Sequence, residues 1–319
     1  MAKADQIKAL ISSHLKKDEE RFRTIALQLA ATEARRGHTS LAEDIRKLVD
    51  STAQRSLKLV SVSPELSDLL IEQEPAANHA SLVVADRIEE KLSRIVAEHR
   101  QAPKLANFGM RNRRKILLAG PPGTGKTMTA SVLARRTGLP FFVVQVDRLF
   151  TRYLGETNAK LRQVFAVIRE RPAVYLFDEF DTLGTARGSE NDVGEMRRVL
   201  NALLQFIEED RSEGLIVAAT NNVGSLDPAL FRRFDDILQY GHPDRNAIEA
   251  VLRNRLATFI GRFKLGPVLA VAKGLSHAEI TEACNDAIKD AILADRRSVT
   301  QKALIIALRD RKGVYGDPE

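Results

Sequence analysis

The stretch Gly120–Thr127 reads GPPGTGKT, which has the residue types and the spacing of a phosphate-binding loop. Its glycines allow backbone N–H groups to turn inward around a polyphosphate, and the N-terminus of a following helix adds its positive end. The lysine of this pattern reaches the β- and γ-phosphates, and the threonine hydroxyl can ligate Mg²⁺. The stretch therefore predicts a site for a nucleotide polyphosphate.

The residues on either side of the loop supply the context that the motif needs. Lys115–Ala119 is a short apolar run that predicts a buried strand, and Met128–Thr137 has helical spacing. A strand that leads into a glycine-rich loop and then a helix is the arrangement in which this motif binds phosphate. The alternative is a chance match in a glycine-rich turn, for which neither neighbour is required.

Two acidic residues, Asp178 and Glu179, follow the apolar run Ala173–Phe177. The carboxyl end of a parallel strand is the edge at which ligands bind, so both carboxylates are expected there. Asp178 is suited to hold Mg²⁺ together with Thr127, and Glu179 to orient and deprotonate an attacking water. The alternative is a pair of solvated acids in a turn. The predicted nucleotide-binding residues are then Pro122, Gly123, Thr124, Gly125, Lys126, Thr127, Met128 and Asp178.

Further polar groups follow the next apolar run, Leu215–Ala219. Asn221 is placed to contact a γ-phosphate or to position water, although the adjacent Asn222 leaves a one-residue ambiguity and a turn-forming Asn is the plain alternative. Arg232 and Arg233 lie between two phenylalanines. They are either salt-bridge residues or arginine fingers that reach a neighbouring subunit's γ-phosphate. Glu179, Asn221, Arg232 and Arg233 are therefore the catalytic candidates.

Apolar runs that alternate with helical stretches predict an α/β fold built on a parallel sheet. Predicted strands occupy 115–119, 140–146, 173–177, 215–219 and 237–240, and four helical stretches follow residue 243. Capping boxes from Ser276 to Glu279 and from Ser298 to Gln301 are expected to open the last two helices. The expected domains are an N-terminal helical bundle (1–58), a linker with one short helix from Pro64 (59–81), an ATPase-like core (82–242) and a C-terminal helical lid (243–319). The bundle is either a docking module for an adaptor or substrate, or a structural appendage.

The bulk composition is that of an ordinary globular protein. The 319 residues are 44% hydrophobic and 29% charged, with a formal net charge of +7. The apolar runs are far short of a membrane span, and Met1–Leu15 is charged, so we expect a cytoplasmic protein without a membrane partner. The single cysteine, Cys284, has apolar neighbours at helical spacing, which indicates a buried structural thiol.

These elements, in this order, resemble the AAA+ ATPases and more narrowly the AAA family proper, over about residues 82–312. The resemblance implies ATP and Mg²⁺ as ligands, a homo-oligomeric ring, expected to be a hexamer, and a helical lid. It also implies that Tyr153, Leu154 and Gly155 correspond to the pore loop that grips a translocating polypeptide in this family. The plain alternative is an ordinary core tyrosine.

The chain departs from the family pattern at two places. The family usually separates its two finger arginines by two residues, whereas Arg232 and Arg233 are adjacent, as in the microtubule-severing and membrane-remodelling relatives. Where the family usually has Ser-Gly-Ala, this chain has Ser276-His277-Ala278, so that His277 either approaches the nucleotide or caps a helix. No His-Glu-x-x-His motif occurs, so no zinc protease is expected in this chain.

The sequence thus favours a ring-forming ATPase that remodels or unfolds proteins through a central pore. A different reading is a nucleic-acid-associated AAA+ switch, such as a helicase loader or transposition helper, motivated by the net charge and by the basic cluster Arg111, Arg113, Arg114 and Lys115. Because aromatic residues are not interleaved with these cations, nucleic acid is the less expected partner. A third reading is an ATPase subunit that regulates a separate enzyme, such as a peptidase.

Overall fold

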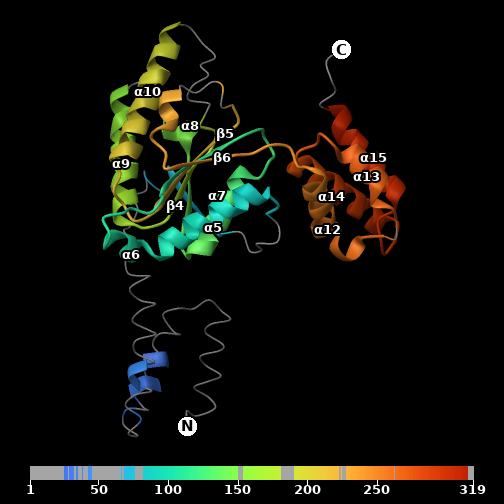
Figure 1. The fold of residues 1–319 in the computed structure, drawn as a ribbon, viewed down its shortest axis with the longest axis horizontal. Helices are drawn as coiled ribbons and strands as arrows, with labels where there is room; N and C mark the ends of the chain where they lie inside the picture. The colour runs from blue at the N-terminus through green and yellow to red at the C-terminus, as the bar shows by residue number, and fades with distance from the viewer. Residues whose placement is uncertain are drawn as a thin grey trace. The chain divides into compact units, whose positions relative to one another are not determined.

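The computed structural model divides the chain into two compact units, Met1–Ser63 and Pro64–Glu319 (Figure 1). The residues that it describes are 25–27, 29–31, 34, 38, 42–44, 66, 68–75, 82–149, 154–180, 190–222, 224, 228–261 and 263–314. The predicted N-terminal bundle falls almost entirely outside these residues and stays a prediction.

The second unit is built on a mixed sheet of short strands. The described strands are β1 (Leu70–Gln73), β2 (Lys115–Ala119), β3 (Phe141–Val144), β4 (Val174–Phe177), β5 (Leu215–Thr220) and β6 (Asp236–Gln239). Their order is β1-β3-β4-β5-β2-β6, and β2 to β6 are parallel to one another. Every residue of β2, β4 and β5 is buried, as expected for strands that helices cover on both faces. The predicted parallel α/β fold is confirmed.

One strand was not predicted. Leu70–Gln73 lies in the segment expected to be a linker, yet it pairs antiparallel with β3, from Leu70 opposite Val144 to Gln73 opposite Phe141. Only Leu70 of this strand is buried, because an edge strand packs little of its surface against the core. A single apolar contact gives no alternating pattern, so the sequence offered no signal for it.

Helices cover both faces of the sheet (Figure 1). One apolar core forms between the sheet and the helices α5 (Asp86–Arg100) and α7 (Lys126–Thr137). The other forms against α9 (Leu154–Glu170) and α10 (Glu190–Glu209). Three short helices complete the core: α6 (Ala102–Ala106), α8 (Val146–Leu149) and α11 (Pro228–Phe231). The sheet is thus a rigid middle layer whose strand ends position the loops of the site.

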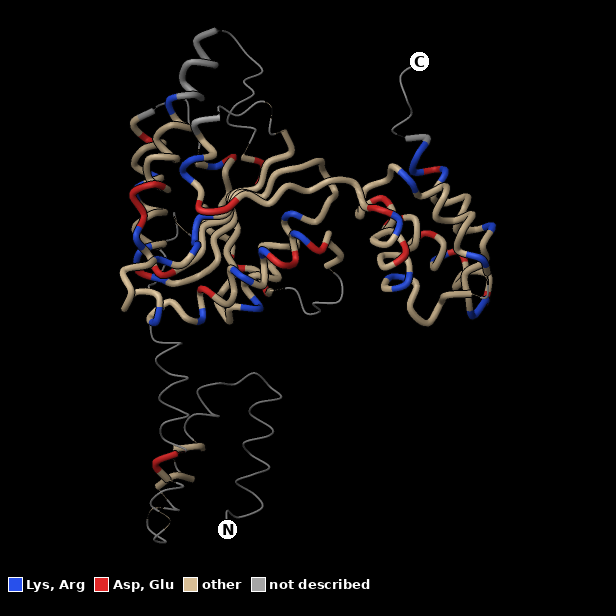
Figure 2. Tube along the Cα trace, in the orientation of Figure 1, with Lys and Arg blue, Asp and Glu red and all other residues tan. Residues whose placement is uncertain are grey.

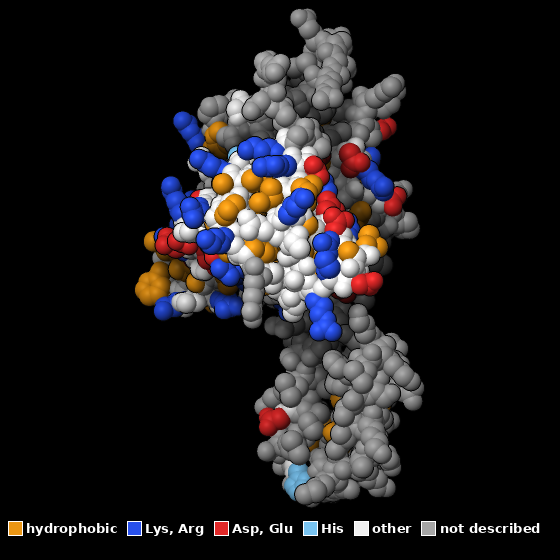
Figure 3. Space-filling model, turned by 90° about the vertical axis from the view of Figure 1, so that its right-hand side faces the viewer, with side chains coloured by type: hydrophobic (Ala, Val, Ile, Leu, Met, Phe, Trp, Pro, Cys, Tyr) orange, Lys and Arg blue, Asp and Glu red, His pale blue; other side chains and the backbone are white. Residues whose placement is uncertain are grey.

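The C-terminal helices, hereafter the lid, form a third apolar cluster. They are α12 (Arg245–Leu256), a 3₁₀ turn (Ala257–Phe259), α13 (Leu265–Ala272), α14 (His277–Leu293) and α15 (Gln301–Val314). Cys284 is fully buried in this cluster, as predicted, and burial raises its pKa to about 12. Figure 3, viewed from the lid side, shows Lys and Arg around exposed apolar side chains.

The predicted caps of the lid helices have different outcomes. Ser276 and Glu279 form the predicted capping box at the start of α14, with the Ser276 N–H donating to the Glu279 carboxylate at 2.6 Å. The box predicted from Ser298 to Gln301 is wrong. Helix α15 begins at Gln301, and the Thr300 hydroxyl accepts the Ala303 N–H at 3.2 Å. Among the described residues, no helix has both the length and the apolar character needed to cross a membrane.

Candidate nucleotide-hydrolysis site

The phosphate loop follows β2 and leads directly into α7. Gly125 has a φ of 96° at the N-cap, so the chain enters the helix through a left-handed turn that favours glycine. The Lys126 side chain is 5% exposed, and its ammonium donates to the carbonyl oxygens of Gly120 at 2.8 Å and Pro121 at 2.7 Å. The carbonyl oxygens of Gly120 and Pro121 thus lie against the Lys126 ammonium, in the loop that is expected to bind a polyphosphate.

Thr127 and Asp178 are brought together from separate elements, 51 residues apart in the chain. The Thr127 hydroxyl donates to the Asp178 Oδ2 at 2.6 Å, which joins the start of α7 to the end of β4. A hydroxyl and a carboxylate in contact are hard oxygen ligands, and Mg²⁺ beside a nucleotide usually takes only one or two protein ligands. The pair therefore fits the predicted metal site.

Glu179 has an unusual backbone. Its φ is 51°, which is uncommon for a residue with a β-carbon, and its side chain is exposed. The Asp178 Oδ1 accepts the Glu179 N–H at 2.9 Å and thereby supports this turn. Strained backbone of this kind is concentrated at functional sites. The two acids on this turn have different surroundings, since Asp178 is bonded to Thr127 at the start of α7 whereas Glu179 is exposed.

A cavity of about 890 Å³ unites these groups. From the core it is lined by Pro122–Met128, Asp178, Glu179 and Asn221, so every predicted nucleotide-binding residue and two of the four catalytic candidates lie on its wall. The remaining wall was not predicted, except that an approach of His277 to the nucleotide was one of the two alternatives for that residue. It consists of Leu82 and Val83, which precede α5, and of lid residues on α12 and α14, namely Val251, Asn254, Arg255, His277, Ala278, Thr281 and Glu282.

The sequence carries little signal for this second wall. Val251 reads as an ordinary core position of a helix and Arg255 as an ordinary surface cation. What places them in the cavity is the packing of the lid beside the phosphate loop, a contact between residues more than 100 positions apart. The N–H of Ala278 donates to the carbonyl of Gly123 at 3.0 Å. The lid is therefore tied to the loop itself.

Gly123 is the residue that permits this close approach. Its φ is 70°, and a β-carbon there would lie 2.7 Å from the Ser276 Oγ and 3.0 Å from the Ala278 Cβ. A larger residue would have to adopt a left-handed backbone and push the start of α14 away. The glycine thus serves the lid contact as well as the turn of the loop.

His277 lies at the first position of α14, and Ser276 is the capping residue. Neither ring nitrogen of His277 is exposed or hydrogen-bonded within the part of the chain that the structure describes. Burial lowers the pKa of His277, and the nearby His242 lowers it further. The imidazole is therefore kept neutral beside the cavity. The alternative in which His277 caps the helix is wrong.

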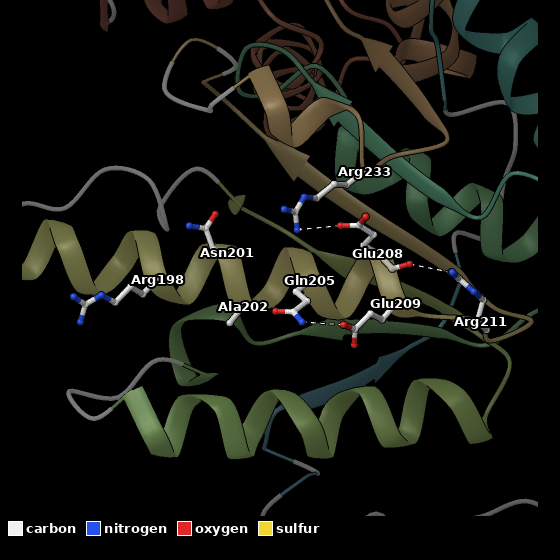
Figure 4. Close-up of a pocket in the computed structure, with 8 residues that line it drawn as sticks. All are labelled: Arg198, Asn201, Ala202, Gln205, Glu208, Glu209, Arg211 and Arg233. Carbon is white, nitrogen blue, oxygen red and sulfur yellow. Dashed lines mark hydrogen bonds and ion pairs between the residues drawn. The ribbon is translucent and has the colours of Figure 1, made fainter.

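The two arginines lie apart from this cavity. The described residues that line it include neither Arg232 nor Arg233. Instead, Arg233 lines a second, more open cavity of about 710 Å³ along α10, shown in Figure 4. Its Nη1 lies 3.3 Å from the Glu208 Oε2, whereas the Arg232 side chain is exposed. Arg233 thus forms a salt bridge, which was the predicted alternative to the finger role, whereas Arg232 is exposed to solvent.

The structure does not describe the side chains of the predicted pore residues Tyr153 and Leu154. Tyr153 lies outside the described residues, and Leu154 is described only as the first residue of α9. Both assignments stay predictions.

Three of the four residues of the basic cluster have partners within the chain. Arg113 lies 3.5 Å from Glu98 and 3.6 Å from Asp236, and Lys115 is 7% exposed with its ammonium on the Glu208 carbonyl at 2.8 Å. Arg114 likewise lies 3.7 Å from the buried Asp210. Figure 2 shows Lys and Arg interspersed with Asp and Glu along the helices of the core and the lid. The cluster therefore gives little support to a nucleic-acid surface.

A phosphate loop at the carboxyl ends of parallel strands, an Asp-Glu pair at the end of β4, which β5 separates from β2, and a helical lid define a P-loop nucleoside triphosphatase. The family profile described as "ATPase family associated with various cellular activities (AAA)" matches residues 116–242. These residues contain β2 from Ile116 onward, β3 to β6, the phosphate loop and the loop that carries Arg232 and Arg233, hereafter the arginine loop.

Individual relatives agree with the family profile. An uncharacterized AAA family ATPase, y4kL, of Sinorhizobium fredii is 34% identical over 97% of this chain and 96% of its own length. The ATP-dependent zinc metalloprotease FtsH 3 of Sphaerobacter thermophilus is 36% identical over 67% of this chain but 45% of its own length. The 26S proteasome regulatory subunit 8 of Caenorhabditis elegans is 28% identical over 81% of this chain and 65% of its own.

The chain belongs to the AAA family of ATPases. The likeness to the S. fredii protein spans nearly the whole of both chains, whereas this chain covers less than half of the metalloprotease. The family membership extends to ATP binding and hydrolysis.

Proposed function

We propose that the protein is an Mg²⁺-dependent ATPase that assembles into a homo-oligomeric ring, expected to be a hexamer, and remodels or unfolds protein substrates through a central pore. The separation of the arginines from the phosphate cavity carries this proposal. Arg232 is exposed on a different surface from the cavity that holds Lys126 and Glu179. A second copy of the chain could bring that arginine to the γ-phosphate from outside.

Each group of the cavity has a distinct task in hydrolysis. Water attacks the γ-phosphorus, the bond from that phosphorus to the β–γ bridging oxygen breaks, and ADP leaves with the charge on its β-phosphate. Glu179 accepts the proton of the attacking water, and Asn221 holds that water or a γ-oxygen. Lys126 and the loop N–H groups bind the β- and γ-oxygens, where negative charge develops.

Thr127 and Asp178 are the residues that would hold Mg²⁺. The metal would neutralise charge on the phosphate oxygens when bound. The contribution of the chain is to fix the hydroxyl and the carboxylate side by side, which the 2.6 Å contact between them achieves before any nucleotide arrives.

A protein substrate is supported by the kinds of relatives that share this core. Their names include a zinc metalloprotease, a peroxisomal ATPase and a proteasome regulatory subunit. In this proposal Tyr153 and Leu154 grip the polypeptide in the pore, and residues 1–58 dock the substrate or an adaptor. A cytoplasmic location belongs to the same proposal. If the chain instead serves a separate peptidase, the ring and the pore keep the same roles.

The substrate class is tested by stimulation of the ATPase. We expect turnover to rise with a permanently unfolded protein and to stay unchanged with double-stranded DNA, measured at two salt concentrations because DNA contacts are salt-dependent. Tyr153→Ala should keep basal turnover and lose the stimulation, and Tyr153→Phe should retain both because it keeps the ring. Stimulation by DNA alone would contradict the proposal and favour the nucleic-acid switch.

The partner is tested with a trapped form of the enzyme. Glu179→Gln should bind ATP without turnover and hold its substrate or partner enzyme during purification. Mass spectrometry of the retained proteins, compared with those retained by the Lys126→Ala variant, would then separate a free-standing remodelling machine from a subunit of a peptidase complex.

A further inference from the structure

We propose that the adjacent arginines have different tasks. Arg232 contacts the γ-phosphate bound by a neighbouring copy of the chain, whereas Arg233 is a positioning residue that Glu208 holds within its own protomer. This inference rests on the proposed function, because it requires that two copies share each nucleotide.

The loop that carries both arginines is anchored at its two ends. On the N-terminal side, Leu230 is 5% exposed and belongs to the apolar core. On the C-terminal side, the Asp235 carboxylate accepts the backbone N–H of Arg114 at 2.8 Å and that of Lys115 at 2.9 Å. Lys115 is the first residue of β2, the strand that leads into the phosphate loop. The arginine loop is therefore held in a fixed position relative to the protomer's own sheet.

An aromatic contact adds a link to the acidic strand end. Phe234, 8% exposed, meets Phe180 edge to face, with ring centroids 6.4 Å apart and an interplanar angle of 82°. Phe180 is fully buried and directly follows Glu179. Because both rings are confined by the core, the arginines have little freedom to swing as a unit, and each must act from where the loop places it.

Arg233 is engaged inside the protomer. Its guanidinium lies 3.3 Å from the Glu208 carboxylate, and Figure 4 shows the two side chains pointing toward one another between the loop and α10. The backbone of Glu208 is itself fixed, because its carbonyl accepts from the Lys115 ammonium at 2.8 Å and from the Arg211 guanidinium at 2.9 Å. An exposed ion pair stabilises little by itself. Its effect here is geometric, since it holds one side of the loop against a rigid helix end.

Arg232 is in the opposite situation. Its side chain is exposed, and it makes no hydrogen bond or ion pair with any residue that the structure describes. Arg233 would have to leave Glu208 to reach a phosphate outside the protomer, whereas Arg232 has no such side-chain partner among the described residues. Its guanidinium presents a planar fork of donors, which suits two oxygens of a γ-phosphate at once.

A charge exchange tests the division. Arg233→Glu and Glu208→Arg should each lower kcat by about tenfold, because each places like charges together and disturbs the loop. The double variant Arg233→Glu/Glu208→Arg restores the pair with its charges reversed, and we expect kcat within about threefold of the original.

Arg232→Ala should lower kcat by about 1,000-fold or more, the usual size of an arginine-finger effect. Arg232→Lys should not rescue it, because an ammonium lacks the fork.

Three results would overturn the division. If the double variant stays as inactive as its parents while it melts and assembles normally, Arg233 itself contacts the nucleotide. If Arg232→Ala keeps full turnover, Arg232 is not the finger. Sedimentation and melting temperature are measured for every variant, and a double variant that fails to assemble is replaced by Arg233→Lys, which keeps the pair with Glu208 and should retain turnover. A loss of turnover in assembled Arg233→Lys would also overturn the division.

A mixing experiment separates this inference from the proposed function. Arg232→Ala and Glu179→Gln are each expected to be inactive alone. In mixed rings the intact cavity of one variant meets the intact arginine of the other, so turnover should return. If mixing restores turnover but the charge exchange fails, only the division is wrong. If mixing restores nothing, the shared site of the proposed function is wrong as well.

Discussion

The phosphate cavity and the arginine loop handle charge in opposite ways. In the cavity, Lys126 is 5% exposed and bonded to carbonyls of its own loop, and Asp178 is bonded to Thr127. In the arginine loop, the backbone is anchored but Arg232 projects into solvent. One region gathers its polar groups inward, whereas the other presents a cation outward. In the proposed function, the two regions are parts of one reaction centre that the chain carries on separate surfaces.

The largest effect is expected from Lys126→Ala, which removes the cation of the inward-facing region. In the proposed function this lysine donates charge-assisted hydrogen bonds to two phosphates, and each such bond is worth about 1.5–3 kcal/mol. We expect ATP affinity to fall by about 100-fold or more, with no measurable turnover. Calorimetric titration with ATP checks this. Lys104→Ala, which removes an exposed lysine from α6, is the matched control and should bind normally.

Glu179→Gln should separate binding from chemistry in the same cavity. The amide keeps the shape of the side chain but cannot accept the proton of the attacking water. Loss of a general base usually lowers the rate by about 10²–10⁴-fold. We therefore expect near-normal ATP affinity and a fall of that size in single-turnover hydrolysis. Retention of full turnover would show that another residue is the base.

Gly123→Ala should weaken the contact between the phosphate loop and the lid. The new β-carbon would lie 2.7 Å from the Ser276 Oγ at a φ of 70°. Gly274→Ala is the control, because its φ is 92° but nothing lies within 4 Å of an added β-carbon. Both should lose about 1–2 kcal/mol of stability from backbone strain. Only Gly123→Ala should also lose ATP affinity, by about tenfold. Denaturant unfolding and ATP titration measure the two effects, and an equal loss of affinity in both variants would contradict the steric argument.

The smallest effect concerns acid stability. Burial and His242 lower the pKa of His277, so below its ordinary value of 6.5 the unfolded chain binds more protons at this residue than the folded chain does. The free energy of unfolding should therefore decrease as the pH falls from 7.5 to 6.0. Burial lowers the pKa of His99 in the same way, so the loss should be smaller in His277→Gln and smallest in His99→Gln/His277→Gln. Equal losses in all three proteins would contradict this account.

The sequence predicted the parts of the fold that short segments determine. The buried strands 115–119 and 173–177 are continuous apolar runs, and the glycine pattern of the phosphate loop is set by local backbone needs. The capping box at Ser276 was predicted for the same reason. Strand β1 was missed because it buries only Leu70, and Thr300 was missed as a cap because Ser298 offered the same local pattern.

The rest of the site depends on contacts that no local pattern encodes. Val251 and Arg255 line the cavity because the lid packs beside the phosphate loop. Glu208 on α10 contacts Arg233, which lies 25 residues further along the chain on the arginine loop. The sequence left open which arginine acts on the nucleotide. The pair with Glu208 is what distinguishes them, and it becomes visible only once α10 and the arginine loop are packed together.

The account depends on a reaction centre shared between two copies of the chain, and dilution tests this most directly. ATPase activity per protomer should be measured from nanomolar to micromolar protein, with the mass of the particles determined by sedimentation in the same samples. We predict that activity per protomer falls on dilution in step with the loss of assembled particles. Constant activity per protomer in samples that contain only monomers would contradict the account.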